Sequence, residues 1–340
     1  ENTIHNSSGK KIQKTRMYGE MLRRSGTGNM WVQVKGYTSE MKGWIFSTQS
    51  NPSYETTRLI ECFESEGIDA YMVHPNEVDI FVSRENRKSV QVANEYASIP
   101  DFVIPRVGSS TTYYQKAVFR HLERMGVMFI NGSDAIDNVK DKLYTMQILA
   151  QNNIPHPKTM LVRNPINPTY VEKNIGFPIV VKSLSGTHGK GVYLAENKRN
   201  FIQLVDMMEQ INDRFNIILQ EYVSDSHGKD IRIVVVGGKV VGGMKRESND
   251  GDFRANITRG GGAKPIEIDE QMEYLALETT NLLGLDISGV DLLYDNGGYK
   301  ICEINSSPGF QGMEKYTDIK VAEQIVNYIK IKLGYTNGNH

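Results

Sequence analysis

Two neighbouring segments in the last fifth of the chain carry oxygen-bearing side chains in a pattern that suits a hard cation. In "YKICEINSSPGF" (299–310), alternation along an expected strand puts Ile301, Glu303 and Asn305 on one face. Asp291 lies in the preceding segment "GVDLLYD". Two carboxylates and one amide suit Mg²⁺, which keeps several waters and bridges to phosphate. A hairpin with a polar solvent face explains the same spacing, and the spacing alone favours that simpler explanation.

A glycine-rich segment could bind phosphate. "SLSGTHGKGV" (183–192) follows Lys182 and joins two expected strands. Backbone N–H groups in such a loop can surround phosphate oxygens, while the lysine adds a point charge. The segment is not a Walker loop, because Gly186 and Gly191 have the right separation but Val192 stands where that motif requires lysine. An ordinary hairpin turn is the alternative.

A long polar segment, "SNDGDFRANITRGGGAK" (248–264), has few residues that could build a core. It contains Arg254, Asn256 and Arg259 beside three consecutive glycines. Arginine next to glycine-rich backbone suits an anionic group, either phosphate or carboxylate. Two basic residues just upstream are explained equally well as part of a solvated charged face: Lys245 and Arg246.

Several other chemistries have no support in the sequence. The seven histidines form no HExxH motif, and no GxSxG nucleophile elbow occurs. The only cysteines, Cys62 and Cys302, lie far apart and form no CxxC or Cys/His cluster. Neither a disulfide framework nor a zinc site is indicated, and a reducing environment fits best.

The elements that would position these groups change in type along the chain. Strand, helix and strand patterns at 41–49, 55–68 and 69–75 predict a parallel sheet with helices on its faces. A strand and loop, a helix, and a strand running into a turn follow, at 101–109, 112–126 and 127–136.

One amphipathic helix is expected over 138–154. The later part reads as mixed α+β with antiparallel sheet. There, two-residue Gly-Gly turns at 237–238 and 297–298 predict hairpins.

Composition bounds the class of protein. The chain has 340 residues, enough for two or three domains, with 39% hydrophobic residues and a formal net charge of −1. That charge argues against direct nucleic-acid binding, and no apolar run predicts a membrane span. Residues 1–40 hold seven Lys or Arg against three Glu. They show weak periodicity, which predicts a basic, partly disordered extension.

Taken in order, these segments resemble the ATP-grasp ligases, and within them the RimK-type glutamate ligases. The resemblance covers roughly residues 41–333 and includes "FVIPRVG", "KDKLYTMQILAQNNI", "GDFRANITRGG" and "CEINSSPGFQGMEK". It implies an α/β and α+β chain with the ATP-grasp fold, whose three subdomains hold the nucleotide between two α+β lobes. The implied divisions are an extension (1–40), a pre-ATP-grasp α/β domain (41–134), a central lid subdomain (135–218), a catalytic subdomain (219–334) and a tail (335–340).

The resemblance also implies roles for individual residues. Asp291, Glu303 and Asn305 would hold two Mg²⁺ or Mn²⁺ ions on the ATP phosphates. Arg254, Lys182 and Asn256 would be catalytic, and Arg106 and Arg259 would meet the substrate. The residues that would contact ATP are Lys142, Lys182, Ser185, Gly186, Gly189, Gly191, Glu221, Tyr222, Asp230, Arg254, Ala255 and Asn256.

The implied activity is ATP-dependent ligation of a carboxylate to an amine through an acyl phosphate. Glutamate would be added to the C-terminus of a peptide or protein by a cytoplasmic homo-oligomer such as a tetramer. One alternative is an ATP-grasp ligase that cyclises a ribosomal peptide or ligates a small amino-acid precursor; another is a non-catalytic ATP-binding protein. Residues 1–40 have no counterpart in the pattern. They are either a passive or added segment, which we favour, or one that presents a peptide or recruits a partner.

Overall fold

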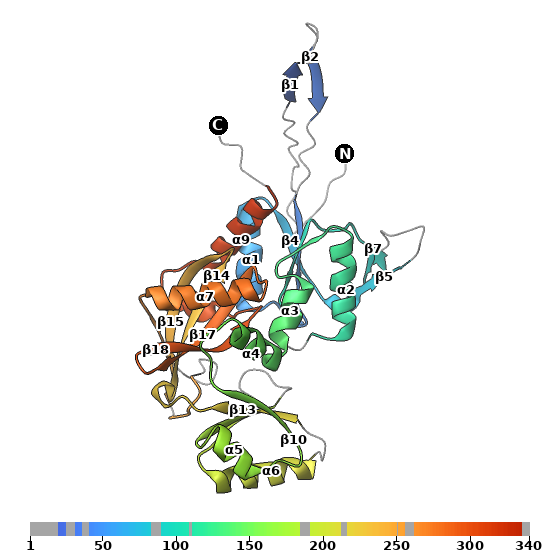
Figure 1. Ribbon diagram of the computed structural model, residues 1–340. Helices are drawn as coiled ribbons and strands as arrows, with labels where there is room; N and C mark the ends of the chain where they lie inside the picture. Colours follow the sequence, from blue (N-terminus) through green and yellow to red (C-terminus); the bar gives the residue numbers. More distant parts are fainter. Residues whose placement is uncertain are drawn as a thin grey trace. The chain divides into compact units, whose positions relative to one another are not determined.

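The computed structural model describes residues 20–24, 31–35, 41–82, 90–108, 111–183, 191–211, 216–249, 251–255 and 262–334 (Figure 1). The chain divides into two compact units, residues 1–41 and 42–340. In the first unit, β1 (Glu20–Arg24) and β2 (Trp31–Lys35) pair antiparallel, with Glu20 opposite Lys35. The extension predicted at 1–40 therefore contains a two-stranded sheet, and its other residues lie outside the described ones.

The second unit begins with the predicted parallel sheet. Its strand order is β4-β3-β8-β9, and every pair is parallel. A small antiparallel sheet, β5-β6-β7, is formed by the strands that come between β4 and β8 in the sequence. The elements are β3 (Lys42–Phe46), α1 (Tyr54–Ser65), β4 (Asp69–Val73), η1 (Pro75–Glu77), β5 (Val78–Ile80), β6 (Val90–Val92), β7 (Glu95–Tyr96), β8 (Phe102–Pro105), α2 (Tyr113–Arg124), β9 (Met128–Phe129) and α3 (Ser133–Lys140).

Helices cover both faces of this parallel sheet, as the sequence predicts. Phe102 contacts Phe63 of α1 with ring centroids 5.0 Å apart, whereas the next residue, Val103, packs in the core that includes α2. Because successive strand residues point to opposite faces, α1 and α2 lie on opposite sides. Helix α9 (Val321–Lys332), from the far end of the chain, lies beside α1 (Figure 1).

The helix predicted over 138–154 is two helices. Helix α3 ends at Lys140, and α4 (Lys142–Gln151) begins after Asp141, whose backbone is extended. The Asp141 carboxylate accepts hydrogen bonds from Leu143 N and Tyr144 N, at 3.0 Å each. An aspartate that caps a new helix competes with continuing the previous one. The apolar periodicity does not reveal this break.

An antiparallel sheet in the order β10-β13-β11-β12 follows α4. Helices α5 and α6 pack on it through the core of Val171, Phe201 and Val205, and both lie along the same side in Figure 1. The elements are β10 (Thr159–Arg163), α5 (Pro168–Asn174), β11 (Ile179–Ser183), β12 (Val192–Ala195), α6 (Lys198–Ile211) and β13 (Asn216–Glu221).

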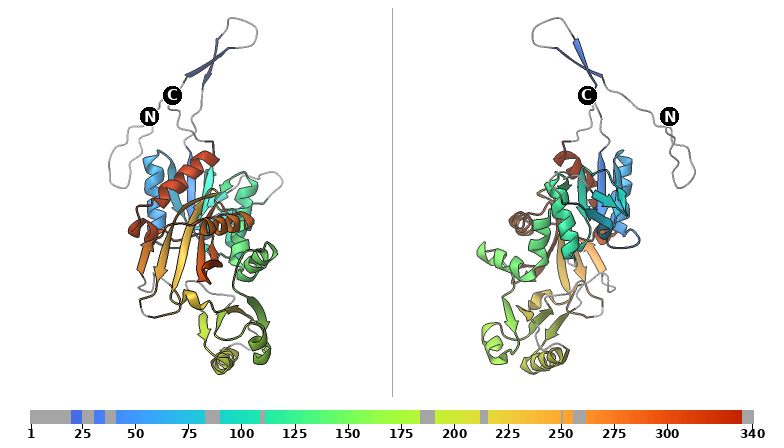
Figure 2. Two further views of the ribbon diagram at one scale, coloured as in Figure 1. Left: turned by 60° about the vertical axis from the view of Figure 1, so that its left-hand side comes forward. Right: turned by 90° about the vertical axis from the view of Figure 1, so that its right-hand side faces the viewer.

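The last part of the chain forms a five-stranded antiparallel sheet, in the order β16-β15-β14-β17-β18. Figure 2 shows this part of the chain from two further sides, coloured from yellow through orange to red. The neighbouring glycines Gly242 and Gly243 lie close to Ile319, before α9, and Ile268, before α7. Because neighbouring strand residues face opposite sides of the sheet, Ile319 and Ile268, which precede α9 and α7, lie on opposite faces. The elements are η3 (Ser224–Ser226), β14 (Lys229–Val236), β15 (Lys239–Glu247), β16 (Gly262–Pro265), α7 (Glu270–Leu282), β17 (Ile287–Asp295), β18 (Gly298–Asn305) and α8 (Gln311–Tyr316).

Both predicted hairpins are present, but one turn is shifted. Gly237 and Gly238 connect β14 to β15 with φ of 58° and 74°. In the second hairpin Asp295 pairs with Gly298, so the turn residues are Asn296 and Gly297, with φ of 47° and 80°. Asparagine tolerates this left-handed conformation better than most residues, which makes Asn-Gly a preferred hairpin turn.

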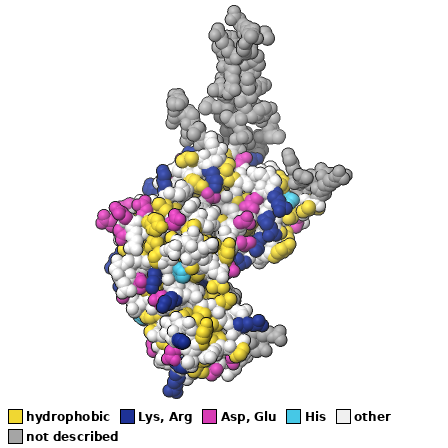
Figure 3. Space-filling view, in the orientation of Figure 1, with side chains coloured by type: hydrophobic (Ala, Val, Ile, Leu, Met, Phe, Trp, Pro, Cys, Tyr) yellow, Lys and Arg dark blue, Asp and Glu magenta, His cyan; other side chains and the backbone are white. Residues whose placement is uncertain are grey.

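Two general features of the surface and helices bear on function. On the face seen in Figure 3, side chains of both charges are interspersed with hydrophobic and uncharged ones. Within the described parts of the chain, no helix combines the length and apolar character needed to cross a membrane.

Candidate active site

The β17–β18 hairpin brings the three predicted metal ligands together. Asp291 on β17 pairs with Glu303 on β18, and Asn305 pairs with Gly289. Both carboxylates and the amide thus lie within two residue positions of one another on adjacent strands. The carboxylate of Asp291 is buried, whereas the Glu303 side chain is 44% exposed.

A β-bulge sets the direction of these side chains. Asp291 pairs with Glu303 but Leu292 pairs with Ile301, so Cys302 is an extra residue in β18. Because of this bulge, Ile301 and Ile304 both pack in the core beneath α7. The prediction that Ile301 shares a face with Glu303 and Asn305 is therefore wrong. Strict alternation holds only beyond the bulge, where Ile304 points into the core between Glu303 and Asn305.

Two arginines hold Asp291. Arg232, its partner on β14, donates from Nε and Nη2 at 2.8 and 2.7 Å, and Arg246 Nη2 lies 3.0 Å from Asp291 Oδ2. Burial acts to raise the pKa of the Asp291 carboxyl, but the two guanidinium groups hold this pKa below its usual value. Arg246 also donates to both oxygens of Asp230 at 2.6 Å. Four charges, two of each sign, thus form one buried network.

This network corrects one interpretation and supplies residues that were missed. Arg246 is only 7% exposed, so it is not part of a solvated charged face. Arg232 received no role from the sequence. The available signal was a charged residue inside the apolar strand pattern "DIRIVVV", which calls for a partner. Both oxygens of Asp230 bond to Arg246. The predicted contact of Asp230 with the ribose stays a prediction.

The two lysines predicted to contact the nucleotide lie at a common cavity with Glu303. Lys142, the first residue of α4, places Nζ 3.8 Å from Glu303 Oε1. Lys182 lies on β11, in the antiparallel sheet β10-β13-β11-β12. The cavity, of about 20 Å³, is lined by Val139, Lys142, Thr145, Met146, Lys182, Ile218, Gln220, Cys302, Glu303 and Ile304.

The bulged residue Cys302 lies at this cavity too. Burial raises the pKa of the Cys302 thiol to about 11, and the nearby Lys182 charge opposes this rise. The thiol is therefore neutral near pH 7 and is not an activated nucleophile. This agrees with a site whose chemistry depends on charged side chains.

Glu221 and Tyr222 lie where β13 ends. The Glu221 carboxylate accepts from the Lys158 backbone N–H at 3.0 Å and from Lys300 Nζ at 3.1 Å. Burial opposes ionisation of Glu221, but these two donors lower its pKa. Tyr222 is hydrogen-bonded to His227 through its hydroxyl. The predicted adenine contacts of both residues stay predictions.

Arg254 connects the polar segment to the sheet that carries Lys182. Its guanidinium donates to Asp252 and, through Nη1, to Val192 O at 3.2 Å. Val192 begins β12, directly after Gly191, whose φ is 75°. Arg254 also lies over the Phe253 ring, 5.5 Å from its centroid. The neighbouring Ala255 is partly buried, and the predicted site residues outside the described part of the chain are Ser185, Gly186, Gly189, Asn256 and Arg259.

Arg106 lies against the turn that follows Asn305. Its Nη1 donates to Pro308 O at 2.9 Å, and its guanidinium carbon lies 5.9 Å from the centroid of Phe310. Its Nη2 is 3.9 Å from Glu55 Oε2. Burial lowers the pKa of this guanidinium, although Glu55 opposes the shift. The predicted substrate contact of Arg106 stays a prediction.

The donor set fits a divalent cation. Carboxylates and an amide are the ligand types that Mg²⁺ and Mn²⁺ accept. The amide oxygen of Asn305 is the atom that could bind the cation. The buried Nδ2 has no hydrogen-bond partner within the described ranges, and as an N–H donor it suits an anionic oxygen such as one on phosphate. In the described residues, no three His, Cys, Asp or Glu side chains form a metal-binding group, so the amide is needed to complete the set.

Two family models match successive parts of the chain. Residues 41–136 match the RimK PreATP-grasp domain, and residues 139–329 match the RimK-like ATP-grasp domain. A probable alpha-L-glutamate ligase of Legionella pneumophila is 38% identical over 304 residues, which cover 88% of this chain and 99% of the relative. A probable alpha-L-glutamate ligase 2 of Pseudoalteromonas atlantica is 39% identical over 290 residues, covering 85% and 95% of the two chains.

Solved structures resemble the fold at low sequence identity. The ATP-grasp ligase PsnB, complexed with a phosphomimetic variant of its minimal precursor, Mg and ADP, has a TM-score of 0.68 at 16% identity. That match covers 86% of this chain and 99% of PsnB. D-alanine–D-alanine ligase from Bacillus anthracis has a TM-score of 0.60 at 16% identity, covering 86% and 99%.

Proposed function

The chain belongs to the RimK-like ATP-grasp ligase family, and on that premise we propose that it adds glutamate to the C-terminal carboxylate of a peptide or protein. It is an ATP-dependent ligase that joins a carboxylate to an amine, and it uses a divalent cation with ATP. The relatives that match over nearly their whole length are named glutamate ligases, which favours glutamate as the amine.

One structural observation carries the proposal. The β17–β18 hairpin presents Asp291, Glu303 and Asn305, and Glu303 lines the same cavity as Lys142 and Lys182. A cation site next to two lysines on separate elements is suited to a polyphosphate, whose negative charge both can share. Simple nucleotide binding would not need this complete set, which argues against a non-catalytic role.

The reaction requires two transfers. The terminal phosphoryl group of ATP passes to an oxygen of the acceptor carboxylate, and ADP leaves. The amine nitrogen of glutamate then attacks the acyl carbon, phosphate departs with the electrons of the broken C–O bond, and the amine loses a proton to solvent. Protein groups in such transfers mainly position the reactants and stabilise charge, so no covalent protein nucleophile is needed.

Each residue has a physical task in this scheme. Lys142, Lys182 and Arg254 supply positive charge around the phosphates. Asp291, Glu303 and Asn305 would hold Mg²⁺ or Mn²⁺, in a two-ion arrangement. A bound ion of this kind polarises phosphoryl oxygens and contributes several kcal/mol to transition-state stabilisation. Arg232 and Arg246 keep Asp291 ionised, as its ligand role requires.

The test is incubation of the protein with ATP, Mg²⁺, glutamate and a panel of peptides, with ADP release and product mass followed together. Glutamylation adds the mass of one glutamate less one water for each round of ligation. A peptide that loses one water would instead reveal a cyclase, and ATP binding without ADP release would reveal a binding protein.

Replacing Glu303 with alanine tests the assignment of the site. We expect a loss of at least about 100-fold in turnover, because several kcal/mol of transition-state stabilisation depend on the metal. Glu273→Ala, which removes an exposed carboxylate on α7, should leave turnover unchanged. Near-normal turnover in Glu303→Ala would refute the metal role of this residue.

A further inference from the structure

The segment after Asn305 is held by side chains from a remote part of the sequence. Residues 306–311 run from the end of β18 to the first residue of α8, and three side chains that precede residue 136 bond to their backbone. These side chains are Glu55 on α1, Arg106 after β8, and Asn131 after β9. We name these three residues the clamp. Each of the three residues makes at least one hydrogen bond that joins the pre-ATP-grasp domain to the segment that follows a candidate metal ligand.

Asn131 makes the most extensive contacts of the clamp. Its side chain is buried, with only 1% of the residue exposed. The amide nitrogen donates to Ser306 O at 2.7 Å and to Ile287 O at 2.8 Å. The amide oxygen accepts from Asp286 N at 2.6 Å and from Ile287 N at 2.8 Å. One side chain thus joins the residue after Asn305 to the beginning of β17, the strand of Asp291.

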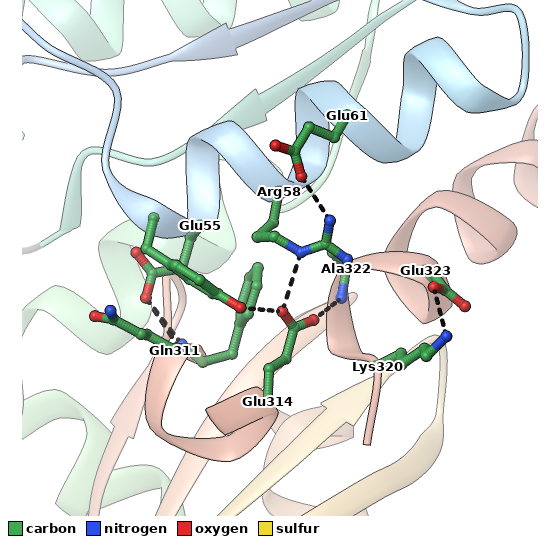
Figure 4. Close-up of polar contacts among 10 residues, drawn as sticks. Glu55, Arg58, Glu61, Gln311, Glu314, Lys320, Ala322 and Glu323 are labelled. Atoms are coloured by element: carbon green, nitrogen blue, oxygen red, sulfur yellow. Dashed lines mark hydrogen bonds and ion pairs between the residues drawn. The ribbon is translucent and has the colours of Figure 1, made fainter. Parts of the chain in front are cut away.

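Glu55 and Arg106 hold the other end of the segment. Glu55 Oε1 accepts from Phe310 N at 3.1 Å and from Gln311 N at 3.3 Å, at the start of α8 (Figure 4). Arg106 donates to the carbonyl of Pro308, which lies between Ser306 and Phe310 in the sequence. The Glu55 side chain is 13% exposed and that of Arg106 is 12% exposed, so neither contact is a surface contact.

Close packing against β17 limits the segment from its other side. Gly289 pairs with Asn305, and a Cβ atom at Gly289 would lie 2.7 Å from Pro308 Cβ. A proline ring has little freedom to move away, so an added methyl group must displace the backbone of the segment. The segment therefore has one position that the clamp and Gly289 together define.

We propose that Glu55, Arg106 and Asn131 are positioning residues that act through the backbone of 306–311 on Asn305. This inference rests on the proposed function, because it takes Asn305 to be a metal ligand. The clamp sets where the amide of Asn305 stands relative to Asp291 and Glu303. A displacement of about 1 Å in a reacting group can cost about 100-fold in rate, even when the changed residue is far from the chemistry.

Glu55→Ala tests the proposal, with Glu314→Ala as the matched control. Glu314 also links α1 to α8 and α9, accepting from Tyr54 Oη, Arg58 Nε and Ala322 N (Figure 4). Its side chain has no described hydrogen bond to the backbone of 306–311; the bond from Glu314 N to Phe310 O, at 3.0 Å, is made by the backbone and is kept in the alanine variant. Both variants remove a mostly buried carboxylate from the same interface, so a purely structural effect should be similar in the two.

Three measurements separate positioning from stability. In Glu55→Ala we expect faster hydrogen exchange at the Phe310 and Gln311 amides. We also expect an increase of about tenfold in the Kd of Mg²⁺, titrated calorimetrically with ADP present, and a fall of about tenfold or more in kcat with little change in the KM for ATP. Glu314→Ala should lower the melting temperature to a similar extent and leave the Mg²⁺ affinity and kcat unchanged.

Gly289→Ala provides a second variant that moves the segment without removing a clamp residue, and it should weaken Mg²⁺ binding as well. The proposal is overturned if Glu55→Ala and Glu314→Ala give equal Mg²⁺ affinity and kcat, or if exchange at Phe310 and Gln311 is unchanged. If the wild-type protein releases no ADP with any acceptor, the proposed function fails. The exchange and Mg²⁺ measurements then still decide whether the clamp positions Asn305.

Discussion

Asp291 has two functions that depend on the same charge. It is a candidate metal ligand, and it is also a carboxylate that balances two arginines in the interior. Asp291 and Asp230 supply two buried negative charges, and Arg232 and Arg246 supply two positive ones. Breaking such a group by removing one partner leaves an uncompensated buried charge, which is strongly destabilising.

Asp291→Asn should therefore lower stability as well as activity. We expect the free energy of unfolding to fall by about 3–5 kcal/mol, because Arg232 and Arg246 would then share one carboxylate. Urea denaturation followed by circular dichroism measures this change. Asp206→Asn, which alters an exposed carboxylate on α6, is the control and should change the value by less than about 0.5 kcal/mol. A loss of under about 1 kcal/mol in Asp291→Asn would contradict a tightly balanced network.

The residues of the site were predictable to the extent that local pattern determines them. Glu303 and Asn305 are polar residues within an apolar strand, and a glycine turn indicates which strand pairs with them. Arg232 and Arg246 were not identified, because a charged residue in a strand does not reveal which acid it meets across the sheet. That partner depends on the register of β14 against both β15 and β17, which is a tertiary property.

At the scale of elements, one extra residue determines the geometry of the hairpin. The bulge at Cys302 lets Ile301 and Ile304 both reach the core, so the strand bends where the polar face begins. Simple alternation cannot anticipate such an insertion. The break between α3 and α4 at Asp141 was missed for a related reason, since apolar periodicity continues through a capping residue.

Helix α7 is attached to β18 through one hydrogen-bonded pair. Asp269 caps the helix, accepting from Met272 N at 2.7 Å, and its other oxygen accepts from Tyr299 Oη at 2.7 Å. Burial, together with the bond to the Asp269 carboxylate and its charge, raises the pKa of the Tyr299 phenol from 10.0 to about 12. Between pH 10 and about 12, the Tyr299 phenol therefore stays protonated in the native state, whereas it is mostly ionised in the unfolded state.

This pair predicts a specific loss of stability in alkali. A raised native pKa means that the contribution of Tyr299 is complete below pH 10 and is lost as the pH rises from 10 to about 12. Urea denaturation at pH values from about 9 to about 12 should show this decline. Tyr299→Phe should be less stable at neutral pH but lose less of its stability over that range. An equal decline in both proteins would rule out the contribution of Tyr299.

At the scale of the whole molecule, the candidate site is assembled from parts that are distant in the chain. Lys142 comes from α4, Lys182 from the sheet covered by α5 and α6, and Glu303 from the five-stranded sheet. The order of the motifs along the chain, more than any single motif, allowed the family and the fold to be predicted from the sequence. The division into a parallel α/β part followed by antiparallel sheets was also predictable, because loop lengths and hydrophobic period change along the chain.

The last prediction concerns residues 1–40. The family matches begin at residue 41, and the Legionella pneumophila relative is covered over 99% of its length by 88% of this chain. This relative therefore has almost no length left over for an equivalent of this segment. Contacts within the chain also separate residues 1–41 from 42–340. Removal of residues 1–40 should leave the urea midpoint and the kcat for ADP release within about a factor of two of the full chain.

The same experiment distinguishes a passive segment from a functional one. If the segment presents a peptide or recruits a partner, its removal will change the KM for one acceptor while kcat and the KM for ATP stay constant. A panel of acidic, basic and neutral peptides is needed, because the segment has a net charge of +4, with seven basic and three acidic residues, and should favour acidic acceptors by charge. Raising the salt concentration should then weaken that preference in the full chain alone, since exposed charges are screened within about 10 Å at 0.1 M. If the KM for each acceptor is the same in the full chain and in the shortened protein, residues 1–40 have no role in acceptor choice.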